Sequence, residues 1–287
     1  LNFKNLENEL TKIDFNGELK KNGDIEFEKI FLKNKKNLIK IEKILLNKNL
    51  KILRFKKAYF NYFDAEKILN TFSVNNKKNN YFLKGKIFNA NNLIETIFED
   101  NQKNLLPFKN NFKLNIQFNT VRLDNEFEID NFNGFLNFKN NNFTEANLNG
   151  FFDNDNKFNF IIKSLNNEKT TILYSDQAKP FINRYKFIEG FEGGILDYYS
   201  SSIEEKTSAT IKVYDFKLNK LPALTKLLTL ASLQGIADLL TGEGIRFNEL
   251  EMNFDTVDSL MTIKEVYAIG PAISILMDGY IEKNKLI

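Results

Sequence analysis

The chain of 287 residues contains no histidine and no cysteine. It therefore lacks the usual general base at neutral pH, most zinc and copper ligands and every thiol nucleophile. Serine–lysine and paired-carboxylate sites need neither residue, but no such residues stand in a recognisable catalytic frame. We expect a protein that is not an enzyme and that uses no cofactor and no metal.

The absence of cysteine excludes disulfides, yet it fits a bacterial envelope protein as well as a cytosolic one. The first ten residues, LNFKNLENEL, contain neither an initiator methionine nor the apolar core of a signal peptide. We expect the chain to be a fragment whose targeting segment lies upstream.

A strong charge of one sign is also missing. The formal net charge is +3, far from the excess of a dedicated nucleic-acid binder, so no nucleic-acid partner is expected. One segment differs, because residues 29–57 hold eleven basic residues and a single acid, Glu42. A solvated strand face explains this segment, and contact with anionic lipid headgroups or with nucleic acid is the alternative.

Long apolar runs are missing as well. The most apolar stretch, residues 221–240, has only eleven uncharged residues between Lys226 and Asp238, whereas a membrane span needs about 20. Its apolar spacing is helical, with Gly235 as a weak point and with glycines at 242 and 244 as the end. We expect a helical end-piece that closes the β core or touches a membrane surface. Its apolar positions are Leu224, Leu227, Leu228, Ala231, Ile236 and Leu240.

Short apolar alternations fill the middle of the chain. Every second residue is apolar from Phe112 to Phe118 and again from Phe158 to Ile162, the period of a strand with one apolar face. The turn-prone segments LDNE, NFNG, KNNN and DNDNK separate these and similar runs. The pattern predicts a meander of antiparallel strands, to which residues 50–55 and 81–88 also belong.

The apolar strand faces need a cover. Some thirty large apolar positions represent about 50 kcal/mol of burial or more, against a net stability of about 5 to 15 kcal/mol. Only residues 91–100 and 221–240 are convincing helices, too few for a sheet of about a dozen strands. The cover is then either another part of the same sheet or a ligand with long apolar tails.

Three short segments resemble ligand-binding loops without meeting their requirements. DNDNK begins like a calcium loop but has Phe158 and Ser164 where glycine and glutamate are required, so it predicts a turn. GEGIRF, from residue 242, lacks the third glycine of a dinucleotide fingerprint. EGFEGG, residues 189–194, predicts tight turns.

Three segments of the C-terminal part together carry a family resemblance. They are KPFINRYKFIEGFEGGILDYYSS (179–201), ATIKVYDFKLNKLPALTKLLTLASLQGIADLLTGEGIRFNELEMNF (209–254) and AIGPAISILMDGYIEKNKL (268–286). Their order resembles the AsmA-like C-terminal region of the AsmA, YhdP and TamB superfamily: Gly-Gly before a strand, an apolar helix leading into a strand, and GPAISI followed by DG. This resemblance covers residues 171–287, and residues 1–170 are expected to be repeating amphipathic sheet continuous with it.

The resemblance implies a setting and a ligand. Members of this superfamily are bacterial envelope proteins held in the inner membrane by an N-terminal helix, which this chain lacks. They extend a curved β-sheet into the periplasm, where an apolar groove takes the acyl chains of phospholipids moving towards the outer membrane. The implied partners are phospholipids.

Together these observations predict a mainly β fold, with an elongated, twisted antiparallel sheet that forms an apolar groove and a helix near its C-terminal end. The expected function is binding and passage of phospholipid acyl chains; the alternatives are a closed β-sandwich module of the envelope and an outer-membrane β-barrel. The expected groove lining is Phe112, Leu114, Ile116, Phe118, Phe158, Phe160 and Ile162.

Overall fold

A computed structural model describes residues 10–92, 94, 111–139, 142–153, 155–183, 190–219, 244–258 and 260–282. The predicted helical end-piece at 221–240, with all six of its apolar positions, lies outside these residues. Of the other predicted helix, Asn91, Asn92 and Ile94 are described and are helical, and the Ile94 amide donates to the Ala90 carbonyl at 2.9 Å.

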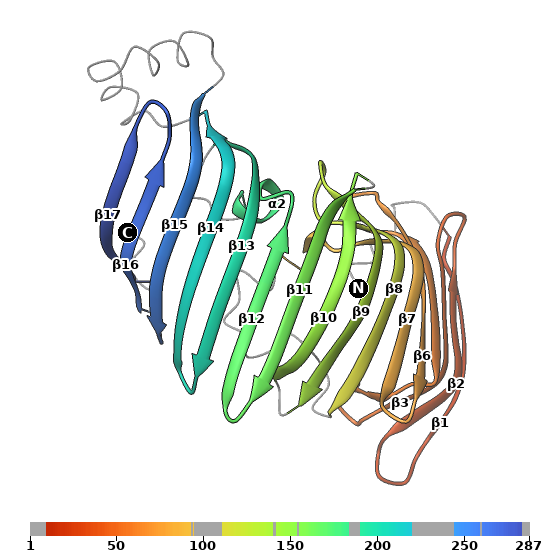
Figure 1. The fold of residues 1–287 in the computed structure, drawn as a ribbon. Coiled ribbons are helices and arrows are strands. Elements are labelled where there is room, and N and C mark those ends of the chain that lie inside the picture. Colours follow the sequence, from red (N-terminus) through yellow and green to blue (C-terminus); the bar gives the residue numbers. More distant parts are fainter. Residues whose placement is uncertain are drawn as a thin grey trace. The chain divides into compact units, whose positions relative to one another are not determined.

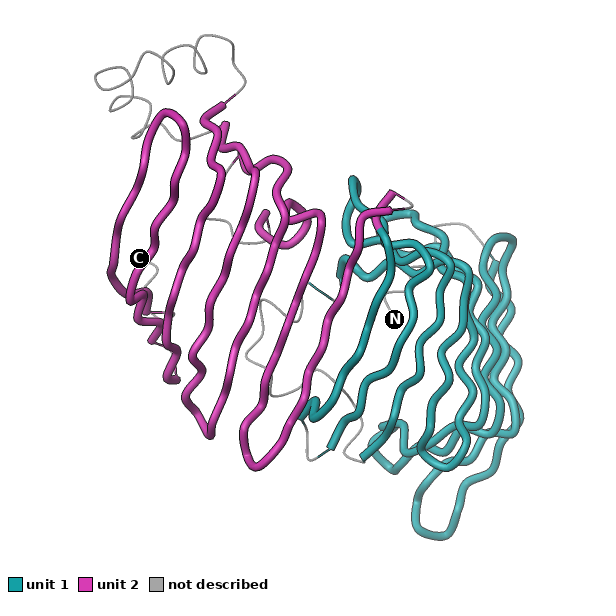
Figure 2. The backbone as a smooth tube through the Cα atoms, in the orientation of Figure 1, with its two compact units in different colours: residues 1–151 teal, residues 152–287 magenta. Residues whose placement is uncertain are grey.

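The chain divides into two compact units, Leu1–Phe151 and Phe152–Ile287 (Figure 2). Residue 171, where we expected the C-terminal region to begin, lies within strand β12 of unit 2. Ten strands begin in unit 1: β1 (Lys12–Leu19), β2 (Ile25–Lys33), β3 (Leu38–Leu46), β4 (Ile52–Arg54), β5 (Lys57–Phe63), β6 (Leu69–Lys77), β7 (Asn80–Asn89), β8 (Phe112–Arg122), β9 (Glu128–Lys139) and β10 (Asn142–Phe152).

Unit 1 is a meander with one exception. Neighbouring strands pair antiparallel, and β3 pairs with both β4 and β5, but β7 and β8 run parallel. A parallel neighbour requires the chain to return along the length of the sheet, and residues 90–111 make this connection. The strands of this unit follow a curved path (Figure 2).

Unit 2 is an antiparallel meander throughout its described part. Its strands are β11 (Asn156–Leu165), β12 (Glu168–Ser175), β13 (Phe191–Ile203), β14 (Lys206–Leu218), β15 (Ile245–Val257), β16 (Leu260–Ile269) and β17 (Ser274–Glu282). Each pairs antiparallel with the next, and the four-residue helix α2 (Lys179–Ile182) lies between β12 and β13 (Figure 1).

The predicted fold class is confirmed. The described residues are dominated by strands in open, twisted and mostly antiparallel sheet, with little helix. The period of two dictates this outcome, because it gives each strand one face that gains from burial and one that stays hydrated.

Two of the segments that we predicted as turns lie inside strands. NFNG belongs to β9 and FEGG begins β13. Positive φ values at Asn131, Gly134, Gly193 and Gly194 explain the error. Asn and Gly tolerate this conformation in a bulge as readily as in a turn, and a bulge bends the strand without ending it. The LDNE turn is confirmed, and Asp153 and Asp155 of DNDNK are in a turn that leads into β11.

Aromatic rings pack across the strands of unit 1 in two groups. Phe72 contacts Phe60, Phe88 and Phe118, with centroid distances of 4.8, 5.6 and 6.1 Å. The second group crosses the sheet near one set of strand ends, as Phe55–Tyr81–Phe112–Phe138–Phe143, with centroids 5.1 to 5.7 Å apart. Such cross-strand contacts fix the register of the sheet.

The core of unit 2 gathers around α2. Ala178 and Ile182 pack with Leu196, Val213 and the stacked rings Phe191–Phe216–Phe247, whose neighbouring centroids are both 5.2 Å apart. Proline at the start of α2 suits a first turn that needs no amide donor. This short helix therefore covers part of one face of the unit 2 sheet.

Candidate functional site

An uninterrupted line of apolar residues crosses the unit 1 sheet at right angles to the strands. Each member is the direct cross-strand partner of the next, so all side chains lie on one face. We call this line the unit 1 apolar row; it consists of Phe15, Ile30, Ile41, Ala58, Val74, Leu83, Ile116, Gly134 and Leu148.

The unit 1 apolar row is long and partly accessible. It crosses nine strands, which at about 4.8 Å per strand amounts to about 38 Å. Phe15 at its end is 70% exposed, Ala58 is buried, and the other members are half-buried. On the next residue positions of the same face, Phe118 and Phe72 are buried. The row is therefore the accessible strip of a face whose aromatic flank is already packed.

Unit 2 carries a line of the same kind. Cross-strand partners run from β11 to β17 without interruption, and the line ends at Met277, which is 52% exposed. At seven strands it is about 29 Å long. The unit 2 apolar row consists of Phe160, Leu173, Tyr198, Ile211, Met252, Val266 and Met277.

The structure places the seven predicted lining residues on two strands in different units. Four lie on one face of β8 and three on one face of β11. Within each set, Ile116 and Phe160 are half-buried members of the two rows, whereas Phe118, Phe158 and Ile162 are buried. Phe112 and Leu114 are half-buried beside the unit 1 row.

Sequence reasoning missed the rest of both rows. Ile30 and Ile41 belong to irregular apolar runs, because bulges near Glu28 and Lys43 shift the alternation of β2 and β3. In unit 2, the signal was available in LEMNF, where Leu250, Met252 and Phe254 alternate with polar residues. Without a pairing partner, however, no single strand reveals a row.

The opposite face of unit 1 is polar. One of its cross-strand lines reads Lys40, Tyr59, Ser73, Lys84, Gln117 and Asn133. Lys113 lies on this face, since it pairs with Asn80 and Asn137, and its ammonium stands 4.3 Å from the ring centroid of Phe135. The two faces of the sheet are thus chemically distinct.

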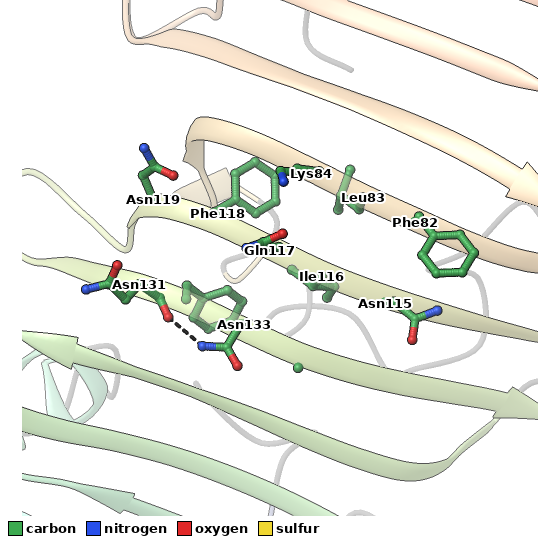
Figure 3. A pocket seen from close by; sticks show the side chains of 12 residues that line it. Phe82, Leu83, Lys84, Asn115, Ile116, Gln117, Phe118, Asn119, Asn131 and Asn133 are labelled. Carbon is green, nitrogen blue, oxygen red and sulfur yellow. Dashed lines mark hydrogen bonds between the residues drawn. The ribbon is translucent and has the colours of Figure 1, made fainter.

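Two depressions lie among the described residues of unit 1. The larger, of about 500 Å³, spans β7, β8 and β9, and its lining combines Lys84, Gln117 and Asn133 of the polar face with Leu83, Ile116 and Gly134 of the unit 1 apolar row (Figure 3). Within it the Asn133 amide donates to the carbonyl of Asn131 at 2.7 Å. The smaller, of about 350 Å³, is lined by Lys40, Glu42, Lys57, Tyr59, Ser73 and Asn75. The lining of the smaller depression is mainly charged and polar, which does not suit hydrocarbon.

No member of either apolar row carries a charge at neutral pH. The single titratable member is Tyr198, whose pKa is raised by burial. Burial likewise raises the pKa of Tyr81, in the neighbouring aromatic group, and raises that of Tyr62 to about 12. These phenols stay neutral, so nothing on the rows requires a charged or metal-bound ligand.

The polar face of unit 2 is held by an ion-pair network. Glu251 accepts from Lys212 at 2.8 Å, from the Asn253 amide at 2.9 Å and from the Tyr267 hydroxyl at 2.9 Å. These contacts, with Lys212 foremost, lower the pKa of Glu251 to about 2. These side chains lie on the face of the unit 2 sheet opposite to the unit 2 apolar row.

Within the described ranges, no helix is long and apolar enough to cross a membrane, and no group of three or more acidic side chains could hold a metal ion. Compared with family models, with curated proteins and with solved structures, the chain has no significant match. What the protein does must therefore be argued from the geometry of the two rows.

Proposed function

We propose that the apolar rows bind the acyl chains of phospholipids and allow them to pass from strand to strand. The observation that carries this proposal is the continuity of each row, in which apolar partners follow one another across nine strands in unit 1 and seven in unit 2. The resemblance described above supplies the expected setting, the periplasmic side of a bacterial envelope.

The dimensions of the rows support hydrocarbon chains as the ligand. One leaflet of a bilayer core is about 15 Å thick, so each row exceeds the length of an acyl chain. Burial of a CH₂ group contributes about 0.8 kcal/mol without fixing its direction. A chain can therefore shift along a row without breaking specific bonds, as transfer requires.

The proposal is tested by what the protein carries and takes up. Protein extracted gently should contain phospholipid by mass spectrometry, and a fluorescent fatty acid should gain intensity when it is added to delipidated protein. Neither result is expected from a closed sandwich whose Phe side chains contact only one another. Absence of both signals would refute acyl-chain binding.

A further inference from the structure

One set of strand ends in unit 1 is strongly basic. β1, β3 and β6 end there, and the following strands begin there, because neighbours are antiparallel. We call the three turns that join them, residues 20–24, 47–51 and 77–80, the basic rim. They carry one carboxylate, Asp24, and six lysines: Lys20, Lys21, Lys48, Lys51, Lys77 and Lys78.

The turns of the basic rim are close to one another in the fold. A Cβ atom added to Gly23 would lie 3.6 Å from Cβ of Lys48. The first two turns are therefore adjacent. Beside the third turn, the Asn76 amide group donates to the Phe55 carbonyl at 3.1 Å, one residue after β4. The Lys113 amide, at the start of β8, donates to the Asn79 carbonyl at 3.1 Å.

Most of this positive charge faces water. Lys20 is paired with the carboxylates of Glu18 and Glu26. The other five lysines of the rim are exposed. Exposed ammonium groups on neighbouring turns add their fields within the Debye length, which is about 8 Å at physiological salt.

The turns at the opposite strand ends have a different balance of positive and negative charge. These turns, residues 34–37, 64–68 and 123–127, carry three lysines and four carboxylates. Asp64 and Glu66 are engaged there with amide groups, and the Asn89 amide donates to both, at 2.8 and 3.0 Å. About nine residues of strand, or about 30 Å, separate the two rims, too far for these carboxylates to neutralise the basic rim.

The apolar face changes character beside the basic rim. The aromatic group Phe55–Tyr81–Phe112–Phe138–Phe143 lies at the same strand ends, where β7, β8 and β10 begin and β9 ends. From rim to face, the order is therefore lysine, aromatic ring, aliphatic row. The same order occurs where proteins meet a bilayer, with basic groups at the phosphates and rings below them.

We propose that the basic rim binds the headgroups of anionic phospholipids at a membrane surface. This inference deepens the proposed function and rests on it in one respect: the headgroups then stay at the rim while the acyl chains reach from the rim onto the unit 1 apolar row. Lipids would be taken up in one orientation, set by the charge difference between the two rims.

Nucleic acid is the less suitable polyanion for this surface. The lysines stand on three separate turns and the chain as a whole carries only +3, whereas nucleic-acid binding relies on dense charge over a continuous patch. Lysines near an anionic leaflet each contribute on the order of 1 kcal/mol, and they act without fixed partners. Separated flexible lysines satisfy that requirement.

The test compares two triple variants of the full chain that lose the same charge. Lys48→Gln, Lys51→Gln and Lys78→Gln remove three of the six lysines of the basic rim, and Lys35→Gln, Lys36→Gln and Lys67→Gln remove the three lysines of the opposite rim. Co-sedimentation with vesicles of phosphatidylglycerol and phosphatidylcholine should weaken about 10- to 100-fold for the first triple and no more than about twofold for the second. Vesicles of phosphatidylcholine alone should bind all three proteins equally poorly.

Three results would overturn the inference. Equal loss for both triples would mean that net charge alone attracts the protein. Unchanged binding of the first triple would exclude the rim. The third is displacement of the vesicles by a single-stranded oligonucleotide. If the oligonucleotide acts at a lower concentration than the lipid concentration that gives half-maximal binding, nucleic acid is the preferred ligand of the rim. Uptake of a fluorescent phosphatidylcholine by the same variants separates the two proposals, because it should persist without the rim lysines and fail if acyl-chain binding is absent.

Discussion

Single side chains decide which face of each sheet can take up hydrocarbon. Ile116 and Phe160 are half-buried members of the two apolar rows. Ile116 has a row neighbour on each side, whereas Phe160, at the end of its row, has one, Leu173. A charge placed at either position would stand in the path proposed for acyl chains.

We expect Ile116→Asp and Phe160→Asp to reduce fatty-acid uptake at least about tenfold, because a carboxylate beside hydrocarbon loses its hydration. Lys113→Asp introduces the same group on the polar face of β8, three residues from Ile116. It should leave uptake within about twofold of the wild type. A fluorescence titration measures all three, and equal losses would show that the face assignment is wrong.

Glu251 should make the stability of the protein depend on pH under acidic conditions. Its pKa is about 2 in the folded chain and 4.5 ordinarily, so the unfolded chain takes up a proton first as the pH falls. The stabilisation is complete above about pH 4.5 and is lost progressively towards pH 2. Asp255, held by Lys264 and Lys206, has a pKa of about 2 as well and adds to the effect.

Glu251→Gln should therefore flatten the dependence of the urea midpoint on pH between 4.5 and 2. Lys212→Met removes the largest cause of the shift and should flatten it in the same way. A circular-dichroism unfolding series at several pH values measures the slope. If both variants keep the slope of the wild type, the network does not contribute as argued.

At the scale of elements, Gly85 allows two aromatic rings to meet across a strand. Gly85 in β7 lies beneath the ring of Phe118 and next to Phe72, and a Cβ atom here would lie 2.5 Å from the Thr71 carbonyl oxygen. The missing side chain lets the two rings meet across β7, with centroids 6.1 Å apart. This contact joins β6 to β8 across the strand that separates them.

Gly85→Val should destabilise the protein by about 1–3 kcal/mol, because the added methyl groups overlap backbone as well as ring atoms. Gly279→Val, in edge strand β17, is the matched control, since nothing lies within 4 Å of its added Cβ. The control should stay within about 0.5 kcal/mol of the wild type. Chemical denaturation followed by circular dichroism compares them, and similar losses would contradict the packing argument.

At the scale of the whole molecule, two kinds of lipid contact should respond differently to salt. Acyl-chain burial involves no charge, whereas attraction between the basic rim and anionic headgroups is screened. Raising NaCl from 0.05 to about 0.5 M should leave fatty-acid uptake within about twofold and weaken vesicle binding about tenfold or more. Parallel titrations on one preparation measure both, and equal salt dependence would mean that a single ionic interaction carries all lipid binding.

Prediction from the sequence succeeded where the signal was local. The alternation around Ile116 and Phe160 identified both strands and showed which residues of each strand share a face, because a period of two is a property of neighbouring residues. It failed at Asn131 and Gly193, where residues that commonly form turns form bulges inside strands. A turn and a bulge have the same local sequence signal, and the pairing of the next strand decides which of the two forms.

The sequence by itself determined that this is a chain of amphipathic strands with one oily and one polar side, because alternation is written residue by residue. Only the tertiary structure decided which residues meet across strands, since register is a relation between distant segments. It dispersed the eleven basic residues of 29–57 over a sheet face and both rims, and it brought Lys21, Lys48 and Lys78 to one rim. The reason is that each antiparallel turn returns the chain to the same edge, so residues about 30 apart in sequence share a surface that no linear pattern predicts.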